Sequence, residues 1–288
     1  MKICFVVELP NWESWDDGLR GAMRIIEKKH EVCYHLNGDI EHEWLSDVIL
    51  AWGGTLSKSY KNIQKYECPK ILLFAGGPIG KDFFTNYNLV CFENNLHTLH
   101  ARSLGIDRMS AFGTNTQVFK PMRQPKMFDV IYPGAFGRWK RKDLFARATK
   151  GLRSFTCGNI QPHEIECWDV CVENGIAVSA DIPQARLPYF MAMSETLCVL
   201  PVAEIGGQRT VLEGMAMKMP VIVPSDAPLV LEFARYGGMI IKPNEGEIRE
   251  AIKASIGRVN REGYEYVMNN YTEEHYASRL RIAIDRVV

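Results

Sequence analysis

The chain has 288 residues, 47% of them hydrophobic and 24% charged, which is typical of a soluble globular protein with room for two domains of ordinary size. Lysine plus arginine and aspartate plus glutamate both number 34, so the formal net charge is zero. This balance does not support a general electrostatic attraction to nucleic acid or to an anionic membrane, although local basic patches remain compatible with it.

The start of the chain carries no sign of a targeting segment. Residues 1–8 reach an acidic side chain, Glu8, too early for a secretory signal, and no apolar run is long enough to span a bilayer. We therefore expect a cytoplasmic protein without a transmembrane segment, and peripheral contact with a membrane is left open.

In the first half of the chain, short apolar runs alternate with longer amphipathic ones, which indicates β-α units around a parallel sheet. Strands are expected at residues 2–7, 31–36, 47–51, 70–74, 89–92 and 108–112, and helices at residues 17–29 and 96–104. Two prolines among polar residues at 121–126 break the pattern. They predict a domain boundary there, with a first domain of residues 1–122.

The second half repeats the alternation and predicts a second parallel sheet in residues 127–270. Strands are expected at residues 128–132, 154–157, 176–179, 196–200, 221–223 and 239–241, and helices at residues 142–151, 164–173, 183–193, 208–217, 229–235 and 245–256. A last amphipathic helix is expected after Thr272, which is its predicted N-cap. The fold class is thus α/β. Two such domains bind ligands outside the carboxyl ends of their strands, so we expect the site in a cleft between them.

The eight cysteines stand mostly inside apolar strand-like runs and lack the paired spacing of a structural zinc site. We expect them to be small buried hydrophobic side chains. Cys167, Cys171 and His163 fall one helical turn apart and could be drawn as three metal ligands, but a helix packing face explains the spacing equally well. The prediction is a protein without a metal site.

A glycine pair, two carboxylates and an arginine surround one predicted strand-to-helix turn between Glu204 and Glu213. Gly206 and Gly207 let the backbone turn sharply and approach a ligand without an intervening Cβ. The N–H groups of the first turn of the following helix attract anions. Glu213 lies one to two turns into that helix, where a carboxylate would repel phosphate but suits the hydroxyls of a sugar diol. The turn therefore predicts a site for a phosphorylated ligand.

A second glycine-bearing turn follows the strand expected at residues 128–132, where Gly134 precedes Arg138 and Lys140. Their guanidinium and ammonium groups can neutralise a pyrophosphate. A nucleic-acid patch is the alternative, because Trp139 stands among further basic residues, which are Arg141, Lys142, Arg147, Lys150 and Arg153. Helical spacing places the later basic residues on different faces of the helix. This favours contact with a ligand phosphate for one or two of the basic residues and exposure to solvent for the others.

Three segments together resemble the retaining nucleotide-sugar glycosyltransferases of family 4, which have the two-Rossmann architecture called GT-B. Residues 113–121 are similar to the interdomain signature G-V-D-x-x-x-F-x-P of that family. Gly134 followed by Lys140 and Asp143 resembles its loop for the donor diphosphate. Residues 204–223 resemble its paired-glutamate motif followed by E-A-M-A-x-G-x-P-V-I, and the last helix resembles the helix that crosses back to the first domain.

The resemblance implies a role for each matching residue. Glu213 would bind the ribose hydroxyls of the nucleotide, and Lys140 with Arg138 or Arg209 would bind the diphosphate. The backbone from Gly206 through Gly207, Gln208 and Arg209 to Thr210 would hold the sugar or its phosphate, and Glu204 would touch the transferred sugar. The sequence departs from the pattern where Ala135 replaces an arginine and where the two glutamates stand one residue further apart than in the family.

The implied activity is the transfer of a hexosyl or pentosyl group from a nucleotide-diphosphate sugar to an acceptor hydroxyl, with retention of configuration. Cationic side chains and a helix N-terminus would stabilise the leaving diphosphate. The chain has no Asp-x-Asp pattern, so we expect metal-independent transfer and no cofactor beyond the donor substrate. The donor phosphate would help to deprotonate the acceptor.

The acceptor is not specified by the sequence, and a glycan, a small molecule or a hydroxylated base in DNA are all possible acceptors. A nucleotide-binding protein of the same architecture without catalysis is the remaining alternative. Candidate acceptor contacts in the first domain are polar or aromatic and lie near predicted strand ends. They are Glu8, Trp12, Trp15, Asp16, Asp17 and His97.

Overall fold

A computed structural model describes residues 1–9, 12, 17–40, 46–77, 79–160, 164–180, 182–202 and 206–288. The chain forms two compact units, one made of Met1–Gly113 with Thr272–Val288 and the other of Thr114–Tyr271. Residues 114–122, which the proline pattern had placed in the first domain, thus belong to the second unit. Within this segment Phe119 is buried, and the Thr114 amide donates a hydrogen bond of 2.7 Å to the Tyr271 carbonyl of the second unit.

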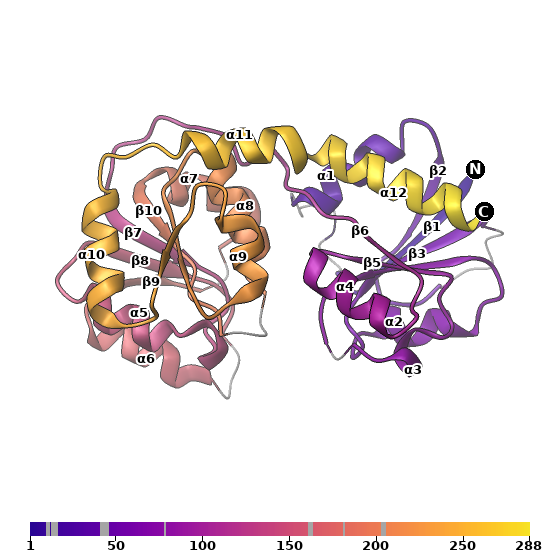
Figure 1. Ribbon diagram of the computed structural model, residues 1–288, viewed down its shortest axis with the longest axis horizontal. Helices are drawn as coiled ribbons and strands as arrows, with labels where there is room; N and C mark the ends of the chain where they lie inside the picture. Colours follow the sequence, from indigo (N-terminus) through magenta and orange to yellow (C-terminus); the bar gives the residue numbers. More distant parts are fainter. Residues whose placement is uncertain are drawn as a thin grey trace. The chain divides into compact units, whose positions relative to one another are not determined.

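The first unit contains a parallel sheet of six strands in the order β2-β1-β3-β4-β5-β6, as the alternation of apolar runs predicts (Figure 1). The strands are β1 (Lys2–Val7), β2 (Glu31–His35), β3 (Val48–Gly53), β4 (Lys70–Phe74), β5 (Leu89–Phe92) and β6 (Arg108–Ser110). The helices between them are α1 (Gly18–Ile26), α2 (Lys58–Asn62), α3 (Lys81–Phe84) and α4 (Asn95–Ser103), and the unit is completed by α12 (Glu273–Val287).

Successive side chains of β1 point to two different cores, because side chains alternate along a strand. Ile3, Phe5 and Val7 pack with α1 and α12 on one face of the sheet. Cys4 and Val6 pack on the other face with residues from α2, α3 and α4. Burial on both faces explains why the strands read as continuous apolar runs in the sequence.

The last helix begins at the expected residue. Thr272 is the N-cap of α12, and its Oγ1 accepts a hydrogen bond of 3.4 Å from the His275 amide. His275 returns the contact through Nδ1, which lies 3.3 Å from the Thr272 amide and completes a capping box. The Arg279 guanidinium donates to the Phe112 carbonyl at 2.8 Å, so the helix is fastened to β6 and its loop within the first unit.

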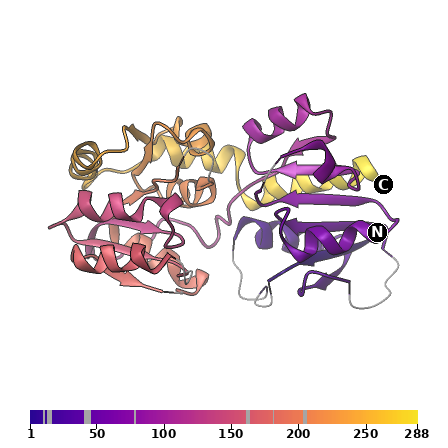
Figure 2. The ribbon, with the colours of Figure 1, turned by 90° about the horizontal axis from the view of Figure 1, so that it is seen from below.

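The second unit has its own six-stranded parallel sheet, in the order β12-β11-β10-β7-β8-β9. The strands are β7 (Phe128–Pro133), β8 (Ser154–Cys157), β9 (Ala177–Ser179), β10 (Ser194–Cys198), β11 (Val221–Pro224) and β12 (Met239–Ile241). The helices are α5 (Lys142–Thr149), α6 (Ile165–Glu173), α7 (Leu187–Ala192), α8 (Gln208–Ala216), α9 (Pro228–Ala234), α10 (Glu245–Ser255) and α11 (Arg261–Asn270). Figure 2 shows helices on both faces of this sheet. The expected pair of parallel α/β sheets is confirmed.

Several short elements escape the sequence pattern. α2, α3 and α11 were not expected, and the helix expected over residues 183–193 is a 3-10 turn, Gln184–Arg186, followed by α7. Pro188 in the first turn of α7 fits a helix start better than a helix interior, which explains the division. α2 and α3 have fewer residues than the sequence period needs for a clear signal.

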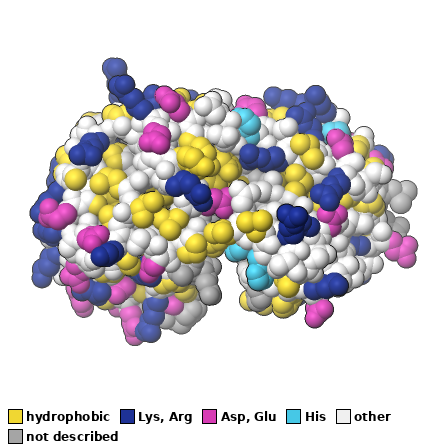
Figure 3. All heavy atoms as spheres, viewed as in Figure 1, with side chains coloured by type: hydrophobic (Ala, Val, Ile, Leu, Met, Phe, Trp, Pro, Cys, Tyr) yellow, Lys and Arg dark blue, Asp and Glu magenta, His cyan; other side chains and the backbone are white. Residues whose placement is uncertain are grey.

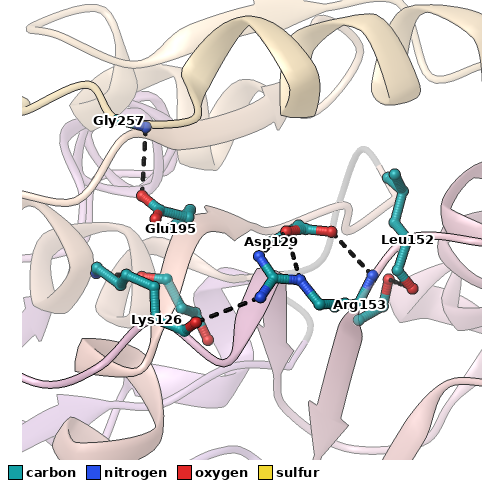
Figure 4. A network of polar contacts seen from close by, with 8 residues as sticks. Lys126, Asp129, Leu152, Arg153, Glu195 and Gly257 are labelled. Atoms are coloured by element: carbon teal, nitrogen blue, oxygen red, sulfur yellow. Dashed lines mark hydrogen bonds and ion pairs between the residues drawn. The ribbon is translucent and has the colours of Figure 1, made fainter.

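Charged side chains lie at the amino ends of the strands of the second sheet, here called its amino edge (Figure 4). The Arg153 guanidinium donates to Asp129, with its Nε 3.0 Å from Oδ1. The Lys126 amine donates to the carbonyl oxygens of Ala192 at 3.0 Å and Ser194 at 2.6 Å. Each cation at this edge therefore has an acceptor that holds the starts of β7, β8 and β10 together.

Thr272→Ala should lower the free energy of unfolding by about 1 kcal/mol, because it removes the side-chain half of the capping box. Ile282→Ala on the exposed face of the same helix is the matched control and should change it little. Urea-induced unfolding followed by circular dichroism measures both. Equal stability of Thr272→Ala and wild type would show that the cap does not anchor this helix.

Candidate functional site

The strand order of the second unit places a topological switch point between the neighbouring strands β7 and β10, and a ligand crevice is expected there. The chain leaves β7 towards β8 on one side and leaves β10 towards β11 on the other, so the connections diverge at the carboxyl ends of β7 and β10. Such a switch point is where open parallel sheets bind ligands. The two glycine-bearing turns singled out in the sequence follow these two strands.

The turn after β7 is supported by the neighbouring backbone of Gly158 and has open space next to Gly134. Gly134 has a φ of +129°, and a Cβ there would meet no described atom within 4 Å. Gly158, which follows β8, has a φ of +150°, and a Cβ there would lie 2.1 Å from the Gly134 carbonyl oxygen. The Gly134 backbone is thus supported closely by Gly158 and leaves free space where a ligand can approach.

Lys140 joins the turns after β7 and β10. Its amine donates a hydrogen bond to the Gly206 carbonyl. The neighbouring Trp139 carbonyl accepts from the Val202 amide at 2.9 Å, and the Tyr132 hydroxyl donates to the Lys140 carbonyl at 2.6 Å. The sequence placed Lys140, Gly134 and Gly206 at one site, and the second unit brings them together.

Burial lowers the pKa of Lys140 to about 8. Among the described residues, no carboxylate forms an ion pair with this amine, so the cost of removing the charge from water is not offset by an opposite charge. An anion at the crevice would supply that charge and raise the pKa. The arrangement is the one expected for a phosphate site.

The helix that follows the second turn carries the remaining donor-site candidates. Gly207 is the N-cap of α8, and its amide donates to Gln208 Oε1 at 2.9 Å. A Cβ at Gly207 would lie 2.8 Å from Val199, which explains the need for glycine there. Arg209 and Thr210 are half-buried in the first turn, and the N-terminus of the helix dipole favours an anion.

Glu213 lies in the second turn of α8 and is only 3% exposed. Burying a carboxylate costs free energy unless polar partners satisfy it. The burial of Glu213 within α8 therefore distinguishes it from a solvated surface residue. Its expected counterpart Glu204 lies outside the described residues.

Arg138 is not placed with Lys140 as the sequence suggested. Its guanidinium forms an ion pair of 2.7 Å with Glu166 at the start of α6, and both side chains are about three-quarters exposed. The 3-10 turn Arg138–Lys140 points successive side chains in different directions, which separates Arg138 from the buried amine. Its expected role as a substitute for the missing arginine at position 135 is therefore not supported by this arrangement.

Three of the remaining basic residues of the loop are paired with carboxylates. Arg141 pairs with Asp226 through two hydrogen bonds of 2.9 and 2.7 Å. Arg147 pairs with Glu245 at 2.8 Å and with Asp143 at 3.1 Å, and Arg153 pairs with Asp129. On the face shown in Figure 3, basic and acidic side chains are interspersed. The nucleic-acid interpretation of this cluster loses its main support.

The cysteines behave as the sequence predicts in the part of the chain that the structure describes. All eight are free thiols, and six of them are buried. Cys171 packs under α5, with its sulfur 3.9 Å from the Lys142 carbonyl. His163 lies outside the described residues, and the described residues contain no cluster of metal-ligating side chains.

The acceptor candidates of the first unit lie in different surroundings. Trp12 is fully buried against Phe5 and Tyr34, so its ring is part of the core and does not offer a face to a sugar. Asp17 is the N-cap of α1 and accepts from the Arg20 amide at 2.9 Å. Trp15 and Asp16 lie outside the described residues.

His97 and Glu8 remain near the carboxyl edge of the first sheet. His97 is half-buried at the start of α4, its Nδ1 lies 3.1 Å from Asn94 Nδ2, and burial lowers its pKa. Glu8 follows β1, accepts from the Lys58 amide at 3.1 Å and pairs with the Lys58 amine at 3.5 Å.

No helix in the described residues is both long and apolar enough to cross a membrane.

One functional candidate was missed by the sequence reasoning. Lys142 was grouped with solvated residues, yet its side chain is fully buried. The available signal was its spacing, because Lys142 stands three and four residues before the apolar Phe145 and Ala146 and so shares their buried face of α5.

A scan against models of known protein families finds no match, and a search of curated proteins finds none. Among solved structures, the chain is similar to a sucrose-phosphate synthase from Thermosynechococcus elongatus, with a TM-score of 0.75 and 13% identity over 99% of this chain and 98% of that one. It is also similar to HepE from Anabaena in complex with UDP and glucose, with a TM-score of 0.72 and 10% identity over 99% of each chain. A DNA-modifying β-glucosyltransferase matches with a TM-score of 0.67 and 13% identity over 99% of this chain and 100% of that one. At these identities the likeness shows the fold, which is the two-domain Rossmann-like GT-B architecture.

Gly158→Ala should lower the free energy of unfolding by about 2–3 kcal/mol, because the new Cβ collides with the Gly134 carbonyl in a backbone conformation that disfavours side chains. Gly151→Ala is the matched control, since Gly151 also has a positive φ but open space around it, and should cost about 1 kcal/mol. Urea unfolding measures the difference. A cost for Gly158→Ala no larger than that of Gly151→Ala would show that the Gly134 turn does not depend on this support.

Proposed function

We propose that this protein is a glycosyltransferase that moves a sugar from a nucleotide-diphosphate donor bound in the second unit to an acceptor hydroxyl. The observation that carries the proposal is the half-buried Lys140 side chain, which joins the turns after β7 and β10 and has no carboxylate partner among the described residues. A positive charge placed in this way at the switch point of a parallel sheet is suited to an anionic ligand.

Each part of the crevice has a task in this proposal. Lys140 and the N-terminus of α8 stabilise the negative charge that grows on the leaving diphosphate. The Gly134, Gly206 and Gly207 turns let the phosphates approach the backbone. Glu213 accepts hydrogen bonds from the ribose hydroxyls, and Glu204 contacts the transferred sugar. Because HepE was solved with UDP and glucose, a UDP-hexose is the first donor to test.

The finer features follow the family resemblance. We propose transfer with retention and without a metal ion, the donor phosphate helping to deprotonate the acceptor, and a glycan, small molecule or modified DNA base as acceptor. We place the protein in the cytoplasm because its eight thiols are unpaired, as a reducing compartment requires.

A thermal-shift screen over UDP, GDP, ADP, CMP and dTDP sugars tests donor binding, because a ligand that binds the folded state stabilises it. Slow donor hydrolysis without acceptor then tests catalysis, and product formation with oligosaccharides, small alcohols or hydroxymethylated duplex DNA tests the acceptor. No stabilisation by any nucleotide would overturn the proposal. Binding without hydrolysis or transfer would indicate the non-catalytic alternative.

Lys140→Met should weaken UDP binding at least about tenfold, since charge-assisted contacts to phosphate are among the strongest hydrogen bonds. In the wild type, affinity should fall as pH rises through about 8, the lowered pKa of Lys140, because only the protonated amine attracts phosphate. Titration calorimetry at several pH values measures both effects. Arg138→Ala is the control, because Arg138 pairs with Glu166, and it should bind UDP like the wild type.

Glu213→Gln should weaken UDP binding more than it weakens binding of inorganic pyrophosphate, because the carboxylate is assigned to the ribose and not to the phosphates. Calorimetric titrations with the two ligands separate these contributions, and Glu247→Gln on α10 serves as an exposed control. Equal losses for both ligands would contradict the ribose assignment.

A further inference from the structure

A second lysine lies directly behind the donor turn and has no role in the mechanism above. Lys142 is fully buried at the start of α5. Its amine donates to the Tyr132 carbonyl and, at 2.6 Å, to Thr156 Oγ1. It lies 3.9 Å from the centre of the Tyr132 ring and 5.2 Å from that of Phe136. The amine is therefore enclosed by neutral acceptors and aromatic faces.

The hydrogen bonds around Lys142 have a defined direction. Thr156 Oγ1 donates to the Tyr132 carbonyl at 2.7 Å, so its lone pairs face the Lys142 amine as acceptors. An ammonium ion fits such a cage because oxygen lone pairs and aromatic faces attract positive charge. The cage attracts a cation without neutralising it.

Among the described residues, the titratable groups with the largest effect on Lys142 are uncharged or positive near neutral pH. The three thiols nearby come from β8, α6 and β10, and burial raises the pKa of Cys157 and of Cys171 to about 11 and that of Cys198 further. Burial also raises the pKa of the Tyr132 hydroxyl. Lys140 is a like charge. The described residues place no carboxylate in an ion pair with Lys142.

Burial, with a smaller repulsion from Lys140, lowers the pKa of Lys142 to about 7. About half of the molecules therefore carry a neutral amine at neutral pH when the crevice is empty. The bond from the Tyr132 hydroxyl to the Lys140 carbonyl, and that from Lys142 to the Tyr132 carbonyl, connect the two lysines through one residue. The charges of Lys140 and Lys142 repel each other, so an anion that contacts Lys140 also acts on the charge of Lys142.

We propose that Lys142 is a buried second charge for the donor diphosphate, which takes up a proton when the ligand binds and so couples donor affinity to pH. The inference rests on the proposed donor site and adds its regulation by protons. The proton comes from solvent and remains on the Lys142 amine while the diphosphate is bound. No bond of the ligand is changed by this step. Lys142 acts from behind the turn and is a positioning residue, not a catalytic one.

The test is isothermal titration calorimetry of the full chain with UDP, with inorganic pyrophosphate and with UDP-glucose, in two buffers of different ionisation enthalpy. The diphosphate of UDP-glucose has no proton to exchange near neutral pH, so for this ligand the difference in binding enthalpy gives the number of protons that the protein takes up. At about pH 7 the wild type should take up about 0.4 of a proton through Lys142 and about a tenth through Lys140. Lys142→Met should keep only the smaller part.

The affinities should show the same effect. A rise of the Lys142 pKa by about one unit on binding corresponds to an affinity about tenfold higher below that pKa than above it. Lys142→Met should therefore bind UDP about tenfold more weakly than the wild type near pH 6, with a much smaller difference near pH 9. A merely structural role for Lys142 would weaken binding equally at all pH values.

Lys126→Met is the matched control, because the Lys126 amine also donates to backbone carbonyls and its pKa is also lowered by burial, but it lies at the opposite edge of the same sheet. It should keep the proton uptake of the wild type. Circular dichroism and thermal unfolding check that both variants are folded. If Lys142→Met does not fold, the pH dependence of proton uptake by the wild type decides. A component centred near pH 7, the lowered pKa of Lys142, would support the inference.

The outcomes separate the two proposals. A wild type that binds neither UDP nor pyrophosphate would overturn the donor site and this inference together. A wild type that binds UDP-glucose with only about a tenth of a proton at pH 7, or a Lys142→Met variant with unchanged uptake, would overturn the role of Lys142 and leave the donor site standing.

Discussion

The hydrogen bond from the Lys140 amine to the Gly206 carbonyl is the contact on which the site depends, because it joins two turns that are separated in the sequence and that leave neighbouring strands. Each turn alone is a glycine-bearing strand end. Together they place a positively charged side chain at the switch point of the sheet, where the connections diverge. The same contact buries the amine, which lowers its pKa and makes it responsive to an anion.

The two ends of the strands in the second sheet each combine an arginine–carboxylate pair with lysine amines that have only neutral acceptors among the described residues. At the amino edge, Arg153 pairs with Asp129, and the Lys126 amine donates hydrogen bonds to two carbonyl oxygens. At the carboxyl edge, Lys140 and Lys142 have only neutral acceptors among the described residues. Leaving buried charge without a counter-charge lowers stability, so an edge built in this way is suited to a ligand that supplies the negative charge.

The neutral charge of the whole chain fits this local arrangement. Arg138, Arg141 and Arg147 of the donor loop are paired with carboxylates, so they contribute little to a long-range field. Lys140 and Lys142, which have no carboxylate partner among the described residues, are half-buried and buried, so their effect on a phosphate is less screened by salt.

The sequence by itself determined the two parallel sheets, the N-cap of the last helix and the turns at Gly134 and Gly206, because periodicity, capping and glycine are local signals. It could not place the unit boundary, since Phe119 and Thr114 are held by contacts distant in sequence. It also did not indicate the ion pair of Arg138 with Glu166 or the burial of Trp12 and Lys142. Whether a charged or aromatic side chain meets a carboxylate, the core or a ligand depends on which strands become neighbours, and the tertiary structure alone decides that.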